Sequence, residues 1–178
     1  TDGVNTLDGI TLLAVGARTS PFLTCRFDEL AAAQHGLNVE TEDLSKIFYL
    51  MEELPNDSRL QARVKELTEY TCWNKALAHD PKAVEKQARL SLVLDQYIDT
   101  YNPQVVGIRC WTEFQEIMDM SPCATLSYLN NGRNDGRVIP TACEVDLGTG
   151  LGMYVMLQNG SEMVACQDWN NNMGDSDT

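Results

Sequence analysis

Two carboxylates, Glu144 and Asp168, stand directly after apolar runs, where a side chain could bind a metal or transfer a proton. Carboxylate oxygens are ligands that Mn²⁺ and Mg²⁺ prefer, and a carboxylate near a substrate can act as an acid or a base. Structural interpretations compete with this one. Glu144 could stabilise the first turn of a helix by about 0.3–1 kcal/mol, and Asp168 could cap a helix. Residue type and spacing alone leave both interpretations open.

Polar segments of this kind follow three predicted strands. Their members are Arg109, Cys110, Trp111 and Glu113; Cys143, Glu144 and Asp146; and Gln167, Asp168 and Asn170 to Asn172. In open parallel α/β sheets, ligands bind outside the carboxyl ends of the strands. We therefore expect these segments to meet at one edge of a sheet.

Two sequence patterns that could suggest other ligands are rejected. The spacing of Asp168, Asn170 and Asn172 resembles the start of a calcium loop, but Met173 stands where such a loop needs glycine. Three glycines between residues 148 and 152 lie inside a predicted helix. A dinucleotide-binding fingerprint would instead lie between a strand and a helix.

Apolar runs alternate with amphipathic segments, which is the pattern of a doubly wound α/β domain with a mostly parallel sheet flanked by helices. The predicted strands are 10–17, 37–41, 104–110, 138–142 and 163–167, and the predicted helices are 27–34, 43–54, 58–73, 81–101, 112–118, 122–129 and 144–158. Gly148, Gly150 and Gly152 each cost the last helix up to about 1 kcal/mol relative to alanine. We expect the backbone of this helix to pack closely against a neighbouring element.

Composition argues against two classes of partner and indicates a cytoplasmic protein. The 178 residues carry a formal net charge of −13, whereas binding to nucleic acid or to an anionic membrane depends on Lys and Arg. No apolar run approaches the roughly 20 residues of a membrane helix, and no signal peptide is evident. The six cysteines lack zinc-site spacing and lie mostly in apolar runs, which predicts buried, reduced thiols.

The stretch from Pro140 to Asn172 resembles the L-fucose isomerase family. It contains a Cys-Glu-x-Asp segment that opens a helix rich in small residues, and an Asp-Trp-Asn-Asn segment follows some two dozen residues later. Earlier segments are similar to the family as well. They are Gly16-Ala17-Arg18, Ser20-Pro21-Phe22, Arg26 to Glu29, Cys110-Trp111, Glu113 to Gln115 and Pro122-Cys123. The resemblance covers most of the chain.

This resemblance implies an enzyme that interconverts an aldose and its ketose through an enediol. It places Glu144 and Asp168 at the two metal-binding carboxylates, which also form the acid–base pair, with Mn²⁺ or another divalent metal such as Mg²⁺ as cofactor. The family's third ligand is a histidine far downstream, and neither His35 nor His79 matches it.

The resemblance also implies a domain organisation. Residues 1–167 correspond to the α/β middle domain, and residues 168–178 correspond to the start of a truncated C-terminal domain. We expect the isolated fragment to be inactive and the full-length protein to be a homo-oligomer that acts on a small sugar.

Arg109, Trp111 and Asn170 are candidate sugar contacts. Relatives often carry glutamine where this chain has Arg109. An arginine there is compatible with a substrate that bears an anionic group, or with a structural salt bridge, so the identity of the sugar stays open. Two other functions stay open too: a non-catalytic sugar-binding module on the same scaffold, and an oligomerisation domain.

Overall fold

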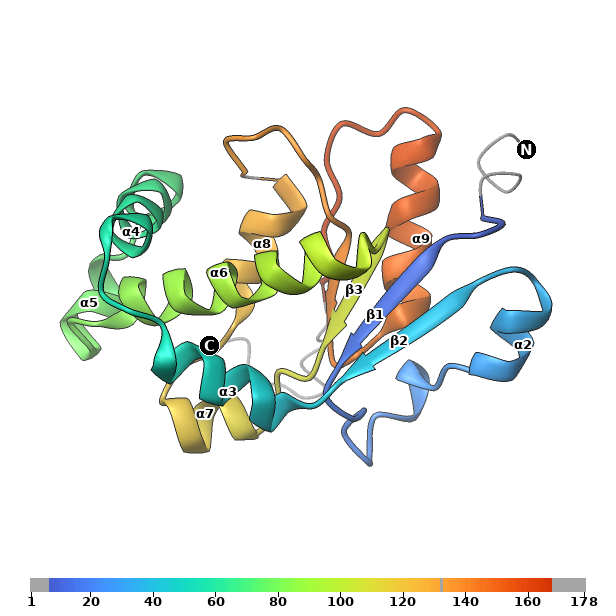
Figure 1. The fold of residues 1–178 in the computed structure, drawn as a ribbon, viewed down its shortest axis with the longest axis horizontal. Coiled ribbons are helices and arrows are strands. Elements are labelled where there is room, and N and C mark those ends of the chain that lie inside the picture. Colours follow the sequence, from blue (N-terminus) through green and yellow to red (C-terminus); the bar gives the residue numbers. More distant parts are fainter. Residues whose placement is uncertain (1–6, 132, 168–178) are drawn as a thin grey trace, which may run out of the picture.

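A parallel sheet of four strands lies at the centre of the part of the protein that the structure describes (Figure 1). The computed structural model describes residues 7–131 and 133–167. The strands lie in the order β2 (Asn38–Glu42), β1 (Thr11–Val15), β3 (Val105–Ile108) and β4 (Thr141–Cys143). All three strand pairings are parallel. The predicted α/β fold is confirmed.

The register of the sheet brings the ends of three strands together. Val15 pairs with Ile108, and Ile108 pairs with Cys143. The next residue of each strand is therefore Gly16, Arg109 or Glu144. The carboxyl ends of β3 and β4, which precede Arg109 and Glu144, meet at one edge as predicted, and the end of β1 lies beside them. The third predicted segment, from Gln167 onward, does not follow a strand.

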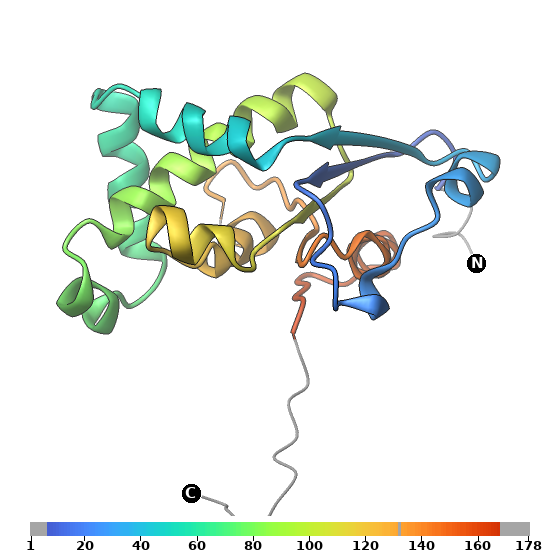
Figure 2. The same cartoon turned by 90° about the horizontal axis from the view of Figure 1, so that it is seen from below.

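One face of the sheet is covered by the larger group of helices. They are α3 (Leu44–Glu53), α4 (Ser58–Tyr70), α5 (Asn74–His79), α6 (Ala83–Tyr101), α7 (Glu113–Met118) and α8 (Cys123–Asn131). Buried side chains of this face, among them Leu13, Val106 and Ile108, share one apolar core with the buried stripe of α6. Figure 2 shows these helices gathered on the side away from α2 and α9.

The opposite face is covered by α2 (Glu29–Gln34) and α9 (Leu147–Gln158). Leu12 and Val105 of the sheet pack there with Ala32 and Leu147. Helix α9 lies close to the sheet at Gly150, where an added Cβ would lie 2.4 Å from Cγ1 of Val105. The expected close packing of the glycine-rich helix is confirmed at this position but not at Gly152, where a Cβ would meet nothing within 4 Å.

Several predicted boundaries were wrong. The predicted helix 58–73 ends at Tyr70, because Trp73 turns back and its indole donates to the carbonyl of Leu67 at 2.7 Å; α5 then follows. Pro81 precedes the N-cap Lys82 of α6 and is not its first helical residue.

The segment 163–167 is not a strand. The side-chain amide of Asn131 donates to the carbonyl of Val164 at 3.0 Å and accepts from its N–H at 3.2 Å, which fulfils the role of a strand partner at this residue. Within the described ranges, no helix is both long enough and apolar enough to cross a membrane.

Candidate functional site

Glu144 lies in a tight turn between β4 and α9. The backbone of Glu144 has a φ of 62° and that of Val145 a φ of 56°, in the left-handed region that side chains rarely adopt. The prediction that Glu144 opens the helix was wrong. Asp146 is the N-cap of α9, and its carboxylate accepts from the N–H of Thr149 at 2.9 Å.

Neighbouring groups hold this unusual turn in place. The N–H of Val145 donates to the carbonyl of Ile108 at 3.2 Å, and the N–H of Asp146 donates to that of Cys143 at 3.0 Å. Gly107 on β3 makes the arrangement possible, because a Cβ there would lie 3.2 Å from the backbone of Val145. Left-handed residues other than glycine cost roughly 1–3 kcal/mol each and persist where the surroundings impose them, often at functional sites.

The carboxylate of Glu144 is contacted by a residue that the sequence did not single out. Cys25 is only 4 % exposed, and its thiol donates to Oε2 of Glu144 across 3.4 Å. Burial, with a contribution from this contact, raises the pKa of the Cys25 thiol to about 11. The thiol is therefore protonated at neutral pH and acts as a hydrogen-bond donor.

Three further thiols surround the carboxyl ends of β3 and β4. Sγ of Cys143 lies 3.8 Å from Sγ of Cys166. A hydrogen bond from Cys143 lowers the pKa of Cys110, whereas the contact with Cys143, together with burial, raises the pKa of Cys166. All six cysteines are reduced, as predicted, but burial was predicted too widely, since Cys72 and Cys123 are exposed.

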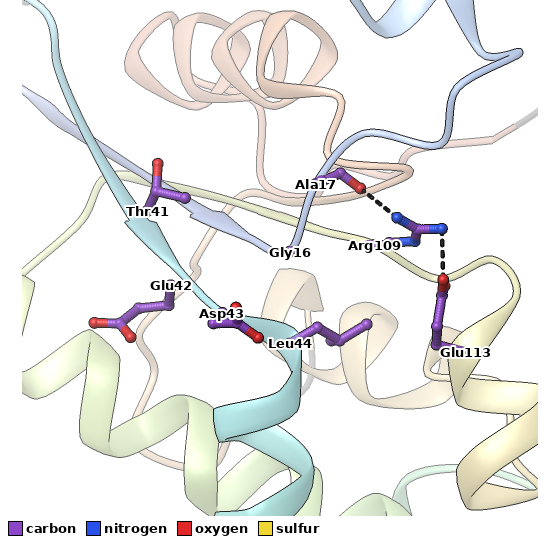
Figure 3. A pocket seen from close by; sticks show the side chains of 8 residues that line it. All are labelled: Gly16, Ala17, Thr41, Glu42, Asp43, Leu44, Arg109 and Glu113. Carbon is purple, nitrogen blue, oxygen red and sulfur yellow. Dashed lines mark hydrogen bonds and ion pairs between the residues drawn. The ribbon is translucent and has the colours of Figure 1, made fainter.

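Arg109 follows β3, and its guanidinium contacts three protein groups, of which Figure 3 shows Ala17 and Glu113. It forms a 2.6 Å ion pair with Glu113, and it donates to the carbonyls of Trp111 at 2.9 Å and Ala17 at 3.4 Å. Burial would raise the pKa of Glu113, but backbone N–H groups and Arg109 together hold it below its ordinary value. The structural salt bridge, one of the two interpretations of Arg109, is present.

An open hollow of about 480 Å³ lies beside this ion pair. It is lined by Gly16, Ala17, Thr41, Glu42, Asp43, Leu44, Arg109 and Glu113 (Figure 3). The hollow occupies the carboxyl ends of β1, β2 and β3. Sugar hydroxyl groups can donate to its carboxylates and accept from the guanidinium. Trp111, 49 % exposed, lies two residues after Arg109.

Two predicted site residues and the two histidines of the chain have not yet been placed. Asp168 and Asn170 lie outside the described residues, as does the predicted segment 168–178. His35 and His79, neither of which matches the family's histidine ligand, lie within the described residues and are exposed.

A divalent metal would need several ligands close together. In residues 7–131 and 133–167, no three His, Cys, Asp or Glu side chains gather so as to hold a metal ion. Glu144 is suited to a hard divalent cation in its chemistry and its place at the sheet edge. The described residues therefore do not form a complete metal site around Glu144, and Asp168, the second predicted metal carboxylate, lies outside them.

The chain is an α/β domain with polar residues gathered at the carboxyl edge of a parallel sheet, a class whose members bind ligands at that edge and have many unrelated functions. No protein-family model matches the chain. The chain is similar to a sulfoquinovose isomerase of Alkalicoccus urumqiensis, with 27 % identity over 122 residues that cover 68 % of this chain and 25 % of that protein.

Sulfoquinovose isomerases of Priestia aryabhattai and Priestia megaterium are 26 % identical to the chain over 135 residues, or 76 % of this chain and 28 % of each protein. The chain thus spans about a quarter of the length of the curated relatives it matches. These relatives are sugar isomerases by name, which agrees with the class of enzyme predicted from the sequence.

Proposed function

We propose that this chain is part of an aldose–ketose isomerase. The observation that carries the proposal is its similarity to three sulfoquinovose isomerases over as much as 76 % of its length. The fold supports it, because Glu144 lies at the carboxyl edge of a parallel sheet, where α/β enzymes bind their ligands.

In this proposal Glu144 is a metal ligand and part of the acid–base pair. Hydrogen bonds of the neighbouring residues hold the backbone of Glu144 in its turn. The Cα from which the carboxylate extends is therefore fixed. Asp168 would supply the second carboxylate. A divalent metal, when bound, polarises the sugar carbonyl and stabilises negative charge that develops beside it. The carboxylates would hold and move the proton between C1 and C2 of the open-chain sugar.

The proposed substrate is an aldose that bears an anionic group, as sulfoquinovose does with its sulfonate. Arg109 follows β3 at the same edge of the sheet as Glu144, and it lines the 480 Å³ hollow. Its Glu113 partner partly neutralises it, so an anionic group would bind here by displacing or sharing that contact. Trp111 and Asn170 are proposed as further sugar contacts.

The test is an isomerisation assay on the protein that contains this chain. Sulfoquinovose, L-fucose and L-arabinose are each incubated with Mn²⁺, with Mg²⁺ or with a chelator, and ketose formation is followed by NMR. We expect sulfoquinovose to be converted, and we expect the chelator to stop the reaction. Replacing Glu144→Gln removes a proton acceptor and should lower kcat by at least about 100-fold. Glu52→Gln, an exposed glutamate on α3, is the matched control.

Other outcomes distinguish the alternatives. Sugar binding that persists in Glu144→Gln, with no isomerisation by the wild type, would favour a non-catalytic sugar-binding module. Conversion of L-fucose but not of sulfoquinovose would keep the isomerase and overturn the anionic substrate. The predicted homo-oligomer is checked separately, by sedimentation.

A further inference from the structure

Two loops that are far apart in the sequence meet at Glu144, the proposed metal-binding carboxylate. The Cys25 thiol, from the segment between β1 and α2, lies 3.4 Å from Oε2 of Glu144, in the turn between β4 and α9. The two residues are 119 positions apart. The sequence pattern does not predict that Cys25 is buried, because a residue in such a loop can equally face water.

The loop that carries Cys25 is built to hold it. One guanidinium nitrogen of Arg18 donates to three carbonyls of the loop, those of Thr19 at 2.8 Å, Ser20 at 2.9 Å and Phe22 at 2.9 Å. The short 3-10 helix Leu23–Cys25 follows directly. The Thr19 hydroxyl also donates to the carbonyl of Trp111 at 3.2 Å, which ties the loop to the segment after β3. The position of the thiol is therefore set by a braced loop.

The thiol restricts how the side chain of Glu144 can turn. The backbone of Glu144 is fixed by the turn, but a glutamate side chain has three rotatable bonds beyond it. A donor to one carboxylate oxygen restricts these rotations and orients the second oxygen. Groups that hydrogen-bond to metal ligands commonly orient them in this way, and their loss costs about 10- to 100-fold in metal affinity or activity.

We propose that Cys25 is a positioning residue: its thiol holds the carboxylate of Glu144 in the orientation that binds the divalent metal of the isomerase. The inference rests on the proposed function, because it takes Glu144 as a metal ligand. Cys25 donates a hydrogen bond to the carboxylate, keeps its proton and is not a metal ligand.

The experiment measures Mn²⁺ affinity by calorimetry in the protein that contains this chain, for wild type, Cys25→Ala, Cys25→Ser and Glu144→Gln. Cys72→Ala, at an exposed cysteine, is the matched control. We expect Cys25→Ala to weaken binding about tenfold, at the lower end of the range for such contacts, because a thiol is a weak donor. Cys25→Ser keeps a donor and should stay within about threefold of wild type, and Cys72→Ala should match wild type.

Each contrary result has one meaning. If Glu144→Gln abolishes Mn²⁺ binding while Cys25→Ala leaves it unchanged, the positioning role is wrong and the proposed function stands. If Cys25→Ser loses as much affinity as Cys25→Ala, the thiol fills space and does not act as a donor, which also overturns the inference. If Glu144→Gln binds Mn²⁺ like wild type, the metal role of Glu144 fails and the inference fails with it.

If Cys25→Ala does not fold, the hydrogen bond of the Cys25 thiol can still be tested without metal and without that variant. The S–H stretching band of a thiol moves to lower frequency when it donates a hydrogen bond. Comparing wild type with Glu144→Gln by infrared difference spectroscopy should show one thiol band shifted, because an amide accepts less strongly than a carboxylate. An unchanged thiol region would overturn the contact.

Discussion

At the scale of single residues, the most deeply buried charge among the described ion pairs is that of Arg133. Its ion pairs join the segment after α8 to α6. The side chain of Arg133 is only 3 % exposed and forms ion pairs with Asp95 of α6 and with Asp135. Arg63 of α4 donates to the second oxygen of Asp95 at 2.9 Å. A buried guanidinium persists only when its partners compensate for the lost water, so these carboxylates must be charged in the folded protein.

Asp135 provides a pH test of this network. The hydrogen bond from Arg133, with others from Arg137, holds the pKa of Asp135 well below its ordinary value. A depressed folded-state pKa stabilises the fold above the unfolded-state pKa of about 3.9 and loses this contribution as the pH falls below it. Asp135→Asn should therefore be less stable than wild type at pH 7, by about 1 kcal/mol since Asp135 is partly exposed. The difference should shrink below pH 4.

Urea denaturation at pH 7 and at pH 3 measures both differences. Asp99→Asn is the control, because Asp99 is 67 % exposed and contacts the same Arg137 at 3.4 Å. It should change stability by less than about 0.5 kcal/mol at either pH. A loss of stability in Asp135→Asn that stays the same at both pH values would show that the charge of Asp135 is not responsible.

At the scale of elements, the contact of α9 with the sheet depends on one missing methyl group. A Cβ on Gly150 would lie 2.4 Å from Cγ1 of Val105, a side chain on a buried strand with restricted rotamers. Gly150→Ala should therefore destabilise the protein by about 1–3 kcal/mol through overpacking, despite the better helix propensity of alanine. Gly152→Ala meets no atom within 4 Å and should stabilise it by up to about 1 kcal/mol.

Chemical denaturation of the two variants beside wild type gives this comparison. Both substitutions add the same methyl group to the same helix, two residues apart, so their difference isolates packing from propensity. Equal effects of the two variants would mean that α9 can move away from β3 at little cost.

The same helix shows where sequence reasoning succeeds and where it stops. Apolar runs and caps predicted the parallel sheet and the place of Glu144 at its edge, since these depend on local periodicity. The left-handed turn at Glu144 was missed because it depends on Gly107, a residue on a neighbouring strand. Cys25 was missed for a similar reason: its contact with Glu144 joins loops 119 residues apart. The places of Asp168 and Asn170 stay predictions.

At the scale of the whole molecule, the net charge of −13 acts against the compact state, because like charges repel more strongly when the chain folds. Ion pairs oppose this effect. The pairs of Arg133 are buried and weakly screened by salt, whereas exposed ones such as Lys65–Glu69, at 3.9 Å, contribute little. Salt should therefore relieve the repulsion more than it weakens the pairs.

This balance predicts the direction in which salt changes thermal stability. Raising NaCl from about 0.01 M to about 0.15 M shortens the screening length from about 30 Å to about 8 Å. At pH 7 we expect Tm to rise by about 2–4 °C, the shift that corresponds to about 1 kcal/mol in a chain of this size. The same titration near pH 4.4, where the sequence carries almost no net charge, is the control and should leave Tm nearly constant. A fall in Tm with salt at pH 7 would mean that exposed ion pairs, and not net repulsion, dominate the electrostatic free energy of folding.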